Sequence, residues 1–218
     1  MQSAKVIIFG VGGVGSWCAE SLVRTGLTHI TLVDNDYVCA SNINRQLMAT
    51  RLTIGQPKVT AMRDHLLTIN PDADVTAIHK AYTKENSTDF RLEEYDYVID
   101  AIDSLPDKAH LILTASECST LFSSMGAALK TDPTMVKVSE FRKVDGDPLA
   151  RALRNRFKKN NTFPKKKFLC VHSTQQPQSN KAACETEKAN GSLCQVTGVF
   201  GLTLASLTVK AISDTLNQ

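Results

Sequence analysis

Several features that would place this sequence in a special class are missing. No stretch approaches the roughly 20 consecutive apolar residues that a membrane-spanning helix needs, and the chain does not open with a basic segment, an apolar run and a cleavage site. The six cysteines are widely spaced and include no Cys-x-x-Cys pair. These absences argue against membrane insertion, secretion, a four-cysteine zinc site and a disulfide-stapled scaffold. They favour a cytoplasmic protein with free thiols.

The composition is that of a folded globular protein. Hydrophobic residues make up 42% of the chain and charged residues 22%, which excludes a disordered or fibrous protein. A chain of 218 residues is long enough for one ordinary α/β domain and not comfortably long enough for two separate cores. We therefore expect a single domain over residues 1–218.

The net charge of +3 hides an uneven distribution. Residues 137–167 contain eleven Lys or Arg and three acidic residues, so this stretch carries +8 and the remainder of the chain carries −5. A phosphate-rich partner responds to such a local potential rather than to the total charge. A solvated loop is the alternative interpretation of the same stretch.

Short apolar segments rich in β-branched residues alternate with longer amphipathic ones. The expected strands are residues 5–9, 29–33, 75–78, 95–100 and 120–124. The expected helices are residues 16–25, about 57–69 and 105–118, with a further short helix between the third and fourth strands. This alternation predicts a doubly wound, mainly parallel Rossmann-like α/β sheet with right-handed crossovers.

The second half of the chain is less regular. Residues 135–141 predict one more strand, of antiparallel direction, and residues 147–158 predict an amphipathic basic helix. Residues 160–192 show neither helical nor strand periodicity, so we expect a long crossover loop there. Residues 198–216 predict a closing helix with one apolar face.

A glycine-rich segment separates the first expected strand from the first expected helix. It contains Gly10, Gly12, Gly13 and Gly15. Glycines placed in this way permit a tight turn, let the backbone approach a phosphate and pack the helix closely on the strand, while the helix N-terminus offers free N–H groups to an anion. Asp34 ends the second strand, where an acid can accept hydrogen bonds from ribose hydroxyls. Together these residues predict a nucleotide site.

Further polar side chains belong at the same edge of the predicted sheet. They are Asp36, Asn42, Arg45, Gln46, Lys58, Asp103 and Ser104. Arg45 can clamp phosphate oxygens in a bidentate manner, and Lys58 adds a compact positive charge near a helix N-terminus. Asp103 supplies a carboxylate of the kind that holds Mg²⁺ between phosphates. Two cations in addition to the glycine loop suit a triphosphate better than a dinucleotide, so we predict ATP with Mg²⁺.

The order and spacing of these motifs resemble the ThiF/MoeB/HesA superfamily, whose adenylating fold is shared with ubiquitin-activating enzymes. From residue 4 to about residue 130 the matching motifs are GxGGxG, LVDxD, SNxNRQ, GQxK and DAID. The resemblance implies that Asp34 holds the ribose and that Asp103 binds magnesium. The residues implied to face the triphosphate are Gly13, Asn42, Arg45 and Lys58. It also implies a nucleotide-binding core over residues 1–130 and a substrate-facing extension over 131–218.

Four motifs in the second half resemble the branch of this superfamily that acts on tRNA. They are Asp132-Pro133-Thr134, Asp147-Pro148-Leu149-Ala150, the segment CVxST from Cys170 and the segment CxxxGxFG from Cys194. Members of that branch close threonylcarbamoyladenosine, a modified base beside the anticodon, into a cyclic form. The resemblance therefore implies an ATP-dependent dehydratase of the adenylate-forming ligase type that releases AMP and pyrophosphate.

The resemblance also implies site residues and partners. The residues expected to act on the reacting groups are Arg45, Lys58, Asp103 and Cys194, with Cys170 as the alternative cysteine; a small buried hydrophobe is the other interpretation of either thiol. The residues expected to hold tRNA phosphates are Arg151, Arg154, Arg156, Lys158 and Lys159. Expected partners are tRNA, a second copy of the chain and a cysteine-desulfurase or sulfur-acceptor system, with no membrane. A monovalent cation is a further expected cofactor.

One departure from the family pattern bears on activity. The first expected strand begins at residue 5, whereas the resemblance implies a preceding helical segment whose arginine reaches the nucleotide of the partner subunit. We expect that the chain is truncated, that another arginine takes this role or that activity is reduced.

Three rival functions use the same motifs. The first is an adenylyltransferase that activates the C-terminal glycine of a ubiquitin-like sulfur-carrier protein. The second is a dinucleotide-binding dehydrogenase or redox-sensing module, and the third is a nucleotide-responsive RNA-binding protein without turnover. The two cations favour ATP over a dinucleotide, and the second-half motifs resemble the tRNA-modifying branch, so we expect that enzyme rather than the three rivals.

Overall fold

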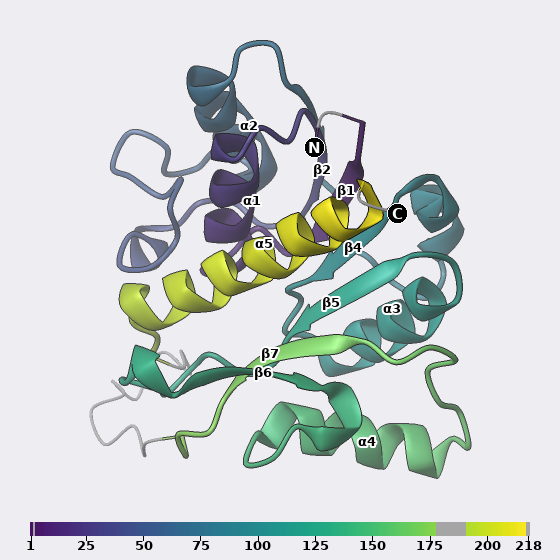
Figure 1. Cartoon of the computed structure of the whole chain (residues 1–218). Helices are drawn as coiled ribbons and strands as arrows, with labels where there is room; N and C mark the ends of the chain where they lie inside the picture. The colour runs from purple at the N-terminus through teal and green to yellow at the C-terminus, as the bar shows by residue number, and fades with distance from the viewer. Residues whose placement is uncertain (2, 178–190, 217–218) are drawn as a thin grey trace.

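Seven strands form one sheet in the computed structural model, which describes residues 1, 3–177 and 191–216 (Figure 1). The strands are β1 Lys5–Phe9, β2 His29–Val33, β3 Asp74–Ile78, β4 Tyr97–Asp100, β5 Thr120–Ser124, β6 Val136–Glu140 and β7 Leu169–Ser173. Their order across the sheet is β3-β2-β1-β4-β5-β7-β6, and only the β6–β7 pair is antiparallel. The predicted doubly wound, mainly parallel sheet is confirmed, including the antiparallel strand at its edge.

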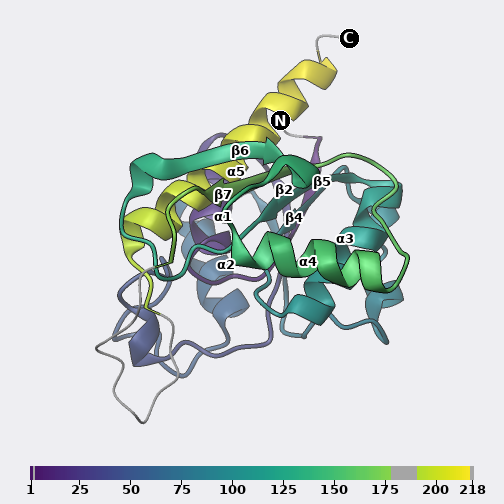
Figure 2. The same ribbon diagram turned by 90° about the horizontal axis from the view of Figure 1, so that it is seen from below.

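Helices cover both faces of this sheet (Figures 1 and 2). On one face lie α1 Gly15–Arg24, α2 Lys58–Ile69 and α5 Cys194–Leu216, and on the other lie α3 Leu105–Cys118 and α4 Pro148–Lys159. Successive residues of a strand point to opposite faces. A strand covered on both sides therefore favours apolar residues at successive positions, which is why apolar residues predominate in β1 and β2 and the last four residues of each are buried.

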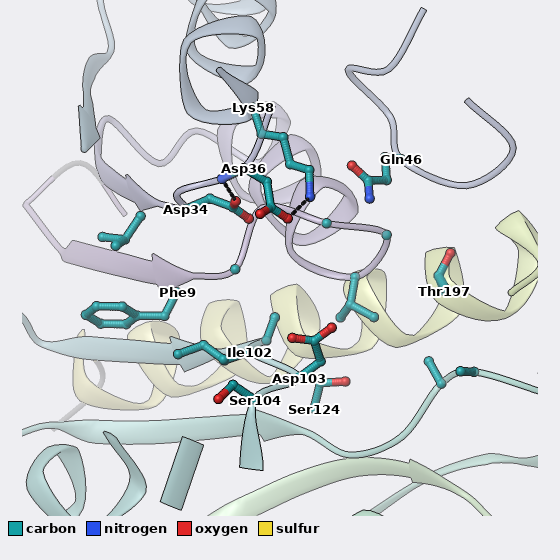
Figure 3. Close-up of a pocket in the computed structure, with 18 of the residues that line it drawn as sticks. Phe9, Asp34, Asp36, Gln46, Lys58, Ile102, Asp103, Ser104, Ser124 and Thr197 are labelled. Carbon is teal, nitrogen blue, oxygen red and sulfur yellow. Dashed lines mark hydrogen bonds and ion pairs between the residues drawn. The ribbon is translucent and has the colours of Figure 1, made fainter. Parts of the chain in front are cut away.

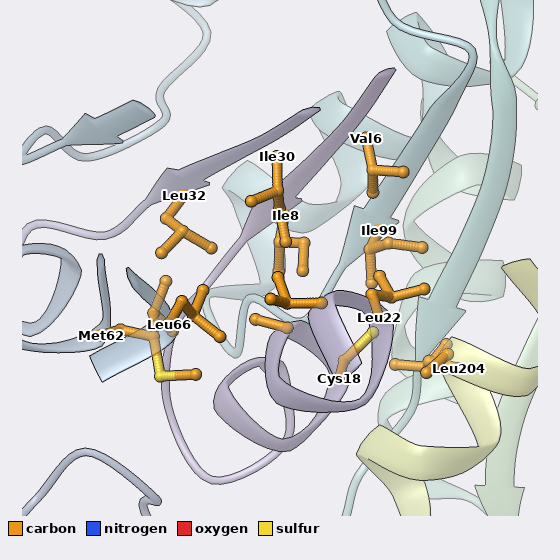
Figure 4. Packing of buried hydrophobic residues seen from close by; sticks show 14 of the residues in the cluster. Val6, Ile8, Cys18, Leu22, Ile30, Leu32, Met62, Leu66, Ile99 and Leu204 are labelled. Carbon is orange, nitrogen blue, oxygen red and sulfur yellow. The ribbon is translucent and has the colours of Figure 1, made fainter. Parts of the chain in front are cut away.

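The core beneath α1, α2 and α5 is built from these alternating side chains (Figure 4). Ile8 of β1 packs in the same fully buried cluster as Leu22 of α1, Met62 of α2 and Leu204 of α5. Burying one side chain of this size contributes roughly 1.5–3 kcal/mol. This packing fixes α1 and α2 on the sheet, and their N-terminal ends thereby lie at the carboxyl edge of the strands.

Two predictions about local structure are wrong. The expected loop over 160–192 contains β7, a buried strand that lies between β5 and β6; five residues are too few to show a period, and their burial comes from strands distant in sequence. Positions 178–190 of that loop lie outside the described residues. The short helix expected before β4 is instead two 3₁₀ turns, Ser87–Phe90 and Leu92–Glu94, separated by Arg91 in a left-handed conformation (φ 41°).

The start of helix α5 differs from the predicted one. Among the described residues, one helix is long and apolar enough to cross a membrane by length and composition, and it spans Cys194–Thr215. The helix begins four residues earlier than predicted, which lengthens its apolar stretch. In the fold it packs on α1 so closely that a Cβ atom on Gly201 would lie 2.4 Å from the carbonyl oxygen of Val14. Such contact is typical of a helix in a protein core.

His172 of β7 gives stability a dependence on pH. Its Nε2 atom is 3.0 Å from the hydroxyl of Ser139, and its Nδ1 atom is buried without a partner among the described residues. Burial lowers the pKa of His172 below its ordinary value of 6.5. Because the unfolded chain binds this proton more readily than the folded chain, folding stability is fully present above that value and falls as the pH drops through the folded-state pKa.

We therefore expect the His172→Gln variant to lose less stability on acidification than the unchanged protein. The measurement is urea unfolding at about pH 7.5 and about pH 5.5, which bracket the ordinary histidine pKa. Burial also lowers the pKa of His110, so part of the pH dependence remains in the variant. Equal losses in the two proteins would contradict the assignment to His172.

Candidate functional site

A cavity of about 610 Å³ opens at the carboxyl edge of the sheet. Its walls come from the segments that directly follow four parallel strands: residues 10–14 after β1, 34–36 after β2, 101–104 after β4 and 124–128 after β5. The connections after β1 and β4 leave toward opposite faces of the sheet, and a crevice forms where they diverge. Ligands of open α/β sheets bind at such a point.

The glycine segment brings α1 directly onto β1. A Cβ atom on Gly15 would lie 1.8 Å from the carbonyl oxygen of Gly10, so no other residue fits at that position. The hydroxyl of Ser16 donates to the carbonyl oxygen of Gly12 at 2.6 Å and fixes the turn. Gly12 and Gly13 line the cavity, and the positive end of α1 is therefore open to an anion.

Asp34 is held by backbone groups on both of its carboxylate oxygens. Oδ2 accepts a hydrogen bond from the N–H of Val11 at 2.7 Å, and Oδ1 accepts one from the N–H of Asp36 at 2.8 Å. Burial raises the pKa of Asp34 above its ordinary value, while Lys58 and these two N–H groups act in the opposite direction. Asp34 lines the cavity, and a carboxylate oxygen that accepts one hydrogen bond can accept another, which suits an acceptor for ribose hydroxyls.

Lys58 reaches the cavity from the first turn of α2 (Figure 3). Its Nζ atom is 2.6 Å from Oδ2 of Asp36, and only 7% of its side chain is exposed. The backbone N–H of Lys58 donates to the carbonyl oxygen of Asp36 at 2.9 Å. Asp36 therefore orients the ammonium group rather than facing a ligand independently, and the ammonium is the compact charge that a phosphate needs.

The segment after β2 supplies three more predicted residues, with different roles in the structure. Nη1 of Arg45 donates to the carbonyl oxygen of Ser41 at 3.0 Å, and this leaves other guanidinium N–H groups available. Asn42 uses Oδ1 to accept the N–H of Cys39 at 3.0 Å, so this oxygen closes its own turn. Gln46 is 5% exposed, and its Oε1 atom has no partner among the described residues although it lies at the cavity. A buried oxygen of this kind points to a missing ligand or water.

Asp103 stands on the opposite wall, in the segment after β4 (Figure 3). Its exposed carboxylate makes no hydrogen bond or ion pair that the structure shows among the described residues. Beneath it, Asp100 and Lys108 form a fully buried ion pair at 2.8 Å, and Lys108 also donates to the carbonyl oxygen of Ile102 at 3.0 Å. Ser104 donates its hydroxyl to Asp107 at 2.6 Å. These contacts fix the loop after β4. The carboxylate of Asp103 is the acidic group of this loop that has no partner among the described residues.

A metal ion would have few protein ligands at this site. Within the described part of the chain, no group of three or more His, Cys, Asp or Glu residues could hold a metal. The single free carboxylate of Asp103 matches Mg²⁺, which typically keeps its waters and uses one or two carboxylates together with phosphate oxygens. The donor set is therefore compatible with a magnesium ion that arrives with a nucleotide.

Neither candidate cysteine lines the cavity. Cys170 is fully buried in β7, and burial raises the pKa of its thiol, so the reactive thiolate is strongly disfavoured. Cys194 is half-buried at the first position of α5, between the lining residues Ser192 and Thr197. Cys194 is thus the better placed of the two, although its side chain is not part of the wall.

Several lining residues escaped the sequence analysis. Lys80 and Tyr82 follow β3, and the rule that ligands bind beyond the carboxyl ends of parallel strands would have found them. The hydroxyl of Tyr82 is 3.0 Å from Nδ1 of His110, and burial raises the pKa of Tyr82 to about 12, so it stays protonated. Ser192 and Thr197 carry no signal in the sequence, because their place depends on how α5 crosses the sheet.

The basic helix α4 contributes Leu149 to the cavity lining. It lies on the face of the sheet that α3 also covers (Figure 2). Its exposed cations are Arg151, Arg156, Lys158 and Lys159. Arg154 differs from them, because its Nη1 atom donates to the carbonyl oxygens of Phe141 at 3.3 Å and Val144 at 2.9 Å. Arg154 therefore holds the segment before α4 in place through this nitrogen, and its role as a phosphate contact stays a prediction.

Comparisons with known proteins agree with this geometry. The sequence model of the ThiF family matches residues 1–218. The chain is 36% identical to the tRNA threonylcarbamoyladenosine dehydratase of Haemophilus influenzae, over 92% of this chain and 82% of that protein. The Molybdopterin-synthase adenylyltransferase of Escherichia coli is 31% identical over 73% of this chain and 62% of that protein.

A solved structure of a tRNA threonylcarbamoyladenosine dehydratase is also similar to this chain. The crystal structure of E. coli tRNA N6-threonylcarbamoyladenosine dehydratase, TcdA, in complex with ATP superposes with a TM-score of 0.88 and 35% sequence identity. The match covers 99% of this chain and 88% of that one.

Gly12 and Gly15 of the turn should respond differently to an added methyl group. Gly15→Ala places its Cβ atom against backbone that cannot rotate away, so we expect a loss of roughly 1–3 kcal/mol or more in unfolding free energy. Gly12→Ala meets only Nε2 of Gln46, at 3.8 Å, and should leave stability within about 0.5 kcal/mol while weakening ATP binding. Thermal unfolding without ligand and calorimetric titration with ATP separate the two effects. A stable Gly15→Ala protein would contradict the close approach.

Proposed function

This chain belongs to the ThiF family, and from that premise we propose that it adenylates the carboxylate of threonylcarbamoyladenosine in tRNA and closes the modification into a ring. The reaction uses ATP and releases AMP and pyrophosphate. One observation carries the chemistry: a single cavity brings together the glycine turn after β1, Asp34 after β2, Asp103 after β4 and Lys58 at the start of α2. The similarity to tRNA dehydratases over most of the chain supports the substrate.

The site binds ATP by complementary charge and hydrogen bonding. Asp34 accepts the ribose hydroxyls, and the N–H groups at the start of α1 face the phosphates. Arg45 and Lys58 offset the negative charge of the triphosphate, which otherwise repels an incoming carboxylate. Asp103 would hold Mg²⁺ together with phosphate oxygens, and the ion would supply further neutralisation of phosphate charge.

The chemistry proceeds in two steps. The carboxylate of the modified base attacks the α-phosphorus of ATP, so a new P–O bond forms, the bond to the β-phosphate breaks and pyrophosphate leaves. A neighbouring group of the same modification then attacks the activated acyl carbon, and AMP leaves as the ring closes. Water is lost overall, at the expense of ATP. Both reacting groups of the second step are already tethered, which lowers its entropic barrier without an external nucleophile.

The exposed cations of α4 supply the contacts with tRNA. Phosphate contacts hold a nucleic acid in position and contribute salt-dependent affinity without reading its sequence. Since α4 begins beside the cavity, a tRNA held along its exposed face has its modified base within reach of the ATP site. Exposed apolar side chains in the segment after β2 support an interface with a second copy of the chain; they are Tyr37, Ile43, Ile54 and Leu52, the last with 90% exposure.

Adenylation of a sulfur-carrier protein is the second candidate, because the phosphate-binding residues serve both reactions equally well. The free basic face of α4 favours tRNA over a protein substrate. A cysteine-desulfurase partner and a monovalent cation remain predictions.

Release of AMP and pyrophosphate from Mg-ATP tests the proposed function directly. We expect release with tRNA that carries threonylcarbamoyladenosine, and none with unmodified tRNA or without tRNA. The Asp103→Asn variant should keep its thermal stability, because the side chain is exposed, and should lose at least about 100-fold in turnover. Release that depends on a sulfur-carrier protein instead, or full turnover in the variant, would overturn the substrate or the metal role respectively.

Charge reversal on α4 tests the tRNA surface. A variant with Glu at Arg151, Arg156 and Lys158 should bind tRNA more weakly by roughly tenfold or more, and its affinity should depend less steeply on salt. ATP affinity should stay unchanged. Arg154→Glu is the matched control, because it reverses a charge on the same helix at a side chain that is bound to backbone carbonyls. Its expected effect is a loss of fold stability through the lost carbonyl contacts. If the triple variant keeps its tRNA affinity and salt dependence, α4 is not the tRNA surface.

A further inference from the structure

One buried carboxylate joins the basic helix to the wall of the cavity. The side chain of Asp147 is fully buried, and its Oδ1 atom accepts the N–H of Ala150 at 3.0 Å, which caps the start of α4. Its Oδ2 atom accepts the N–H of Gly126 at 3.2 Å. Gly126 and Leu149 both line the cavity. The first turn of α4 and the wall that follows β5 are therefore held by the same group.

Lys130 completes this connection. Its Nζ atom is 3.2 Å from Oδ2 of Asp147 and 3.1 Å from the carbonyl oxygen of Ser173 in β7, and only 1% of its side chain is exposed. The preceding residue, Leu129, has a left-handed backbone (φ 60°) and donates its N–H to Gly191 at 2.8 Å. The segment from Gly126 to Lys130 is thus tied down at both ends, although one of its residues has an unfavourable conformation.

A buried ion pair in this position contributes little to the stability of the fold. Two buried charges give up their hydration, and apolar residues of similar size stabilise a core as well or better. What a buried pair provides is a defined geometry, because each charged group is satisfied only in one arrangement. Here that arrangement sets where α4 stands relative to the cavity wall opposite Asp34 and Lys58, the side on which Figure 3 shows Ser124.

We propose that Asp147 and Lys130 are positioning residues for the reaction, an inference that rests on the proposed function. The exposed side chains of α4 hold the tRNA, and the pair fixes that helix to the wall against which the modified base must lie. Its task is to bring the carboxylate of the base to the α-phosphorus of ATP. A displacement of about 1 Å at such a point can cost on the order of 100-fold in rate.

The Asp147→Asn variant removes this link with little change in shape. The amide oxygen can still cap α4, while the amide nitrogen replaces the acceptor that faced the N–H of Gly126 and the ammonium of Lys130. We expect kcat with modified tRNA to fall by about tenfold or more, and the dissociation constants for ATP alone and for tRNA alone to change by less than about threefold.

A double variant separates positioning from stability. Asp147→Asn combined with Lys130→Met also removes the buried charge left without its partner, so the melting temperature should recover toward that of the unchanged protein. The N–H of Gly126 still lacks its acceptor, so kcat should stay low. If the pair is merely structural, kcat recovers together with the melting temperature. Should the single variant not fold, the double variant alone decides.

Glu20→Gln is the matched control. Glu20 is also a buried carboxylate, with Arg24 at 2.6 Å and His65 at 2.7 Å, and it does not line the cavity. The control should lose stability with kcat within about threefold of the unchanged protein. The inference is overturned by an equal loss of kcat in the control, by an unaffected Asp147→Asn variant or by a double variant with restored kcat. If the unchanged protein releases no AMP with modified tRNA, the proposed function fails and this inference falls with it.

Discussion

The close contact between the start of α1 and the end of β1 is the constraint on which the site depends. Helix and strand can approach this closely only because position 15 carries no side chain. The approach places the positive end of α1 at the crevice between β1 and β4, where the connections of the sheet diverge. Asp34 is bound to the same turn through the N–H of Val11. The anion site and the ribose acceptor are therefore parts of one rigid unit.

Around this unit, charged groups are oriented by partners that a ligand does not need to displace. Asp36 holds the ammonium of Lys58, and the buried pair of Asp100 and Lys108 holds the loop that carries Asp103. Two groups that face the cavity, the carboxylate of Asp103 and the buried oxygen of Gln46, have no partner among the described residues. Preorganised charges of this kind stabilise developing charge on phosphates without reorganising during the reaction.

In the proposed function, the second half of the chain adds substrate recognition to the nucleotide site. β7 enters the sheet between β5 and the edge strand β6, and α4 then covers this end of the sheet. The same face carries the exposed cations, and Asp147 joins it to the wall of the cavity. The cavity and the proposed tRNA surface are thus separate parts of the molecule that meet at one buried carboxylate.

The sequence by itself determined the alternation of strands and helices in the first half, the mainly parallel sheet that this alternation forms, the position of the glycine turn and the edge at which Asp34, Lys58 and Asp103 gather. It could do so because strand and helix periods, and the loops after parallel strands, are local properties. Only the tertiary structure decided that Leu169–Ser173 is a strand, that Arg154 is bound to backbone carbonyls and that Thr197 lines the cavity. All three depend on contacts between different elements of the fold, for which no local pattern exists.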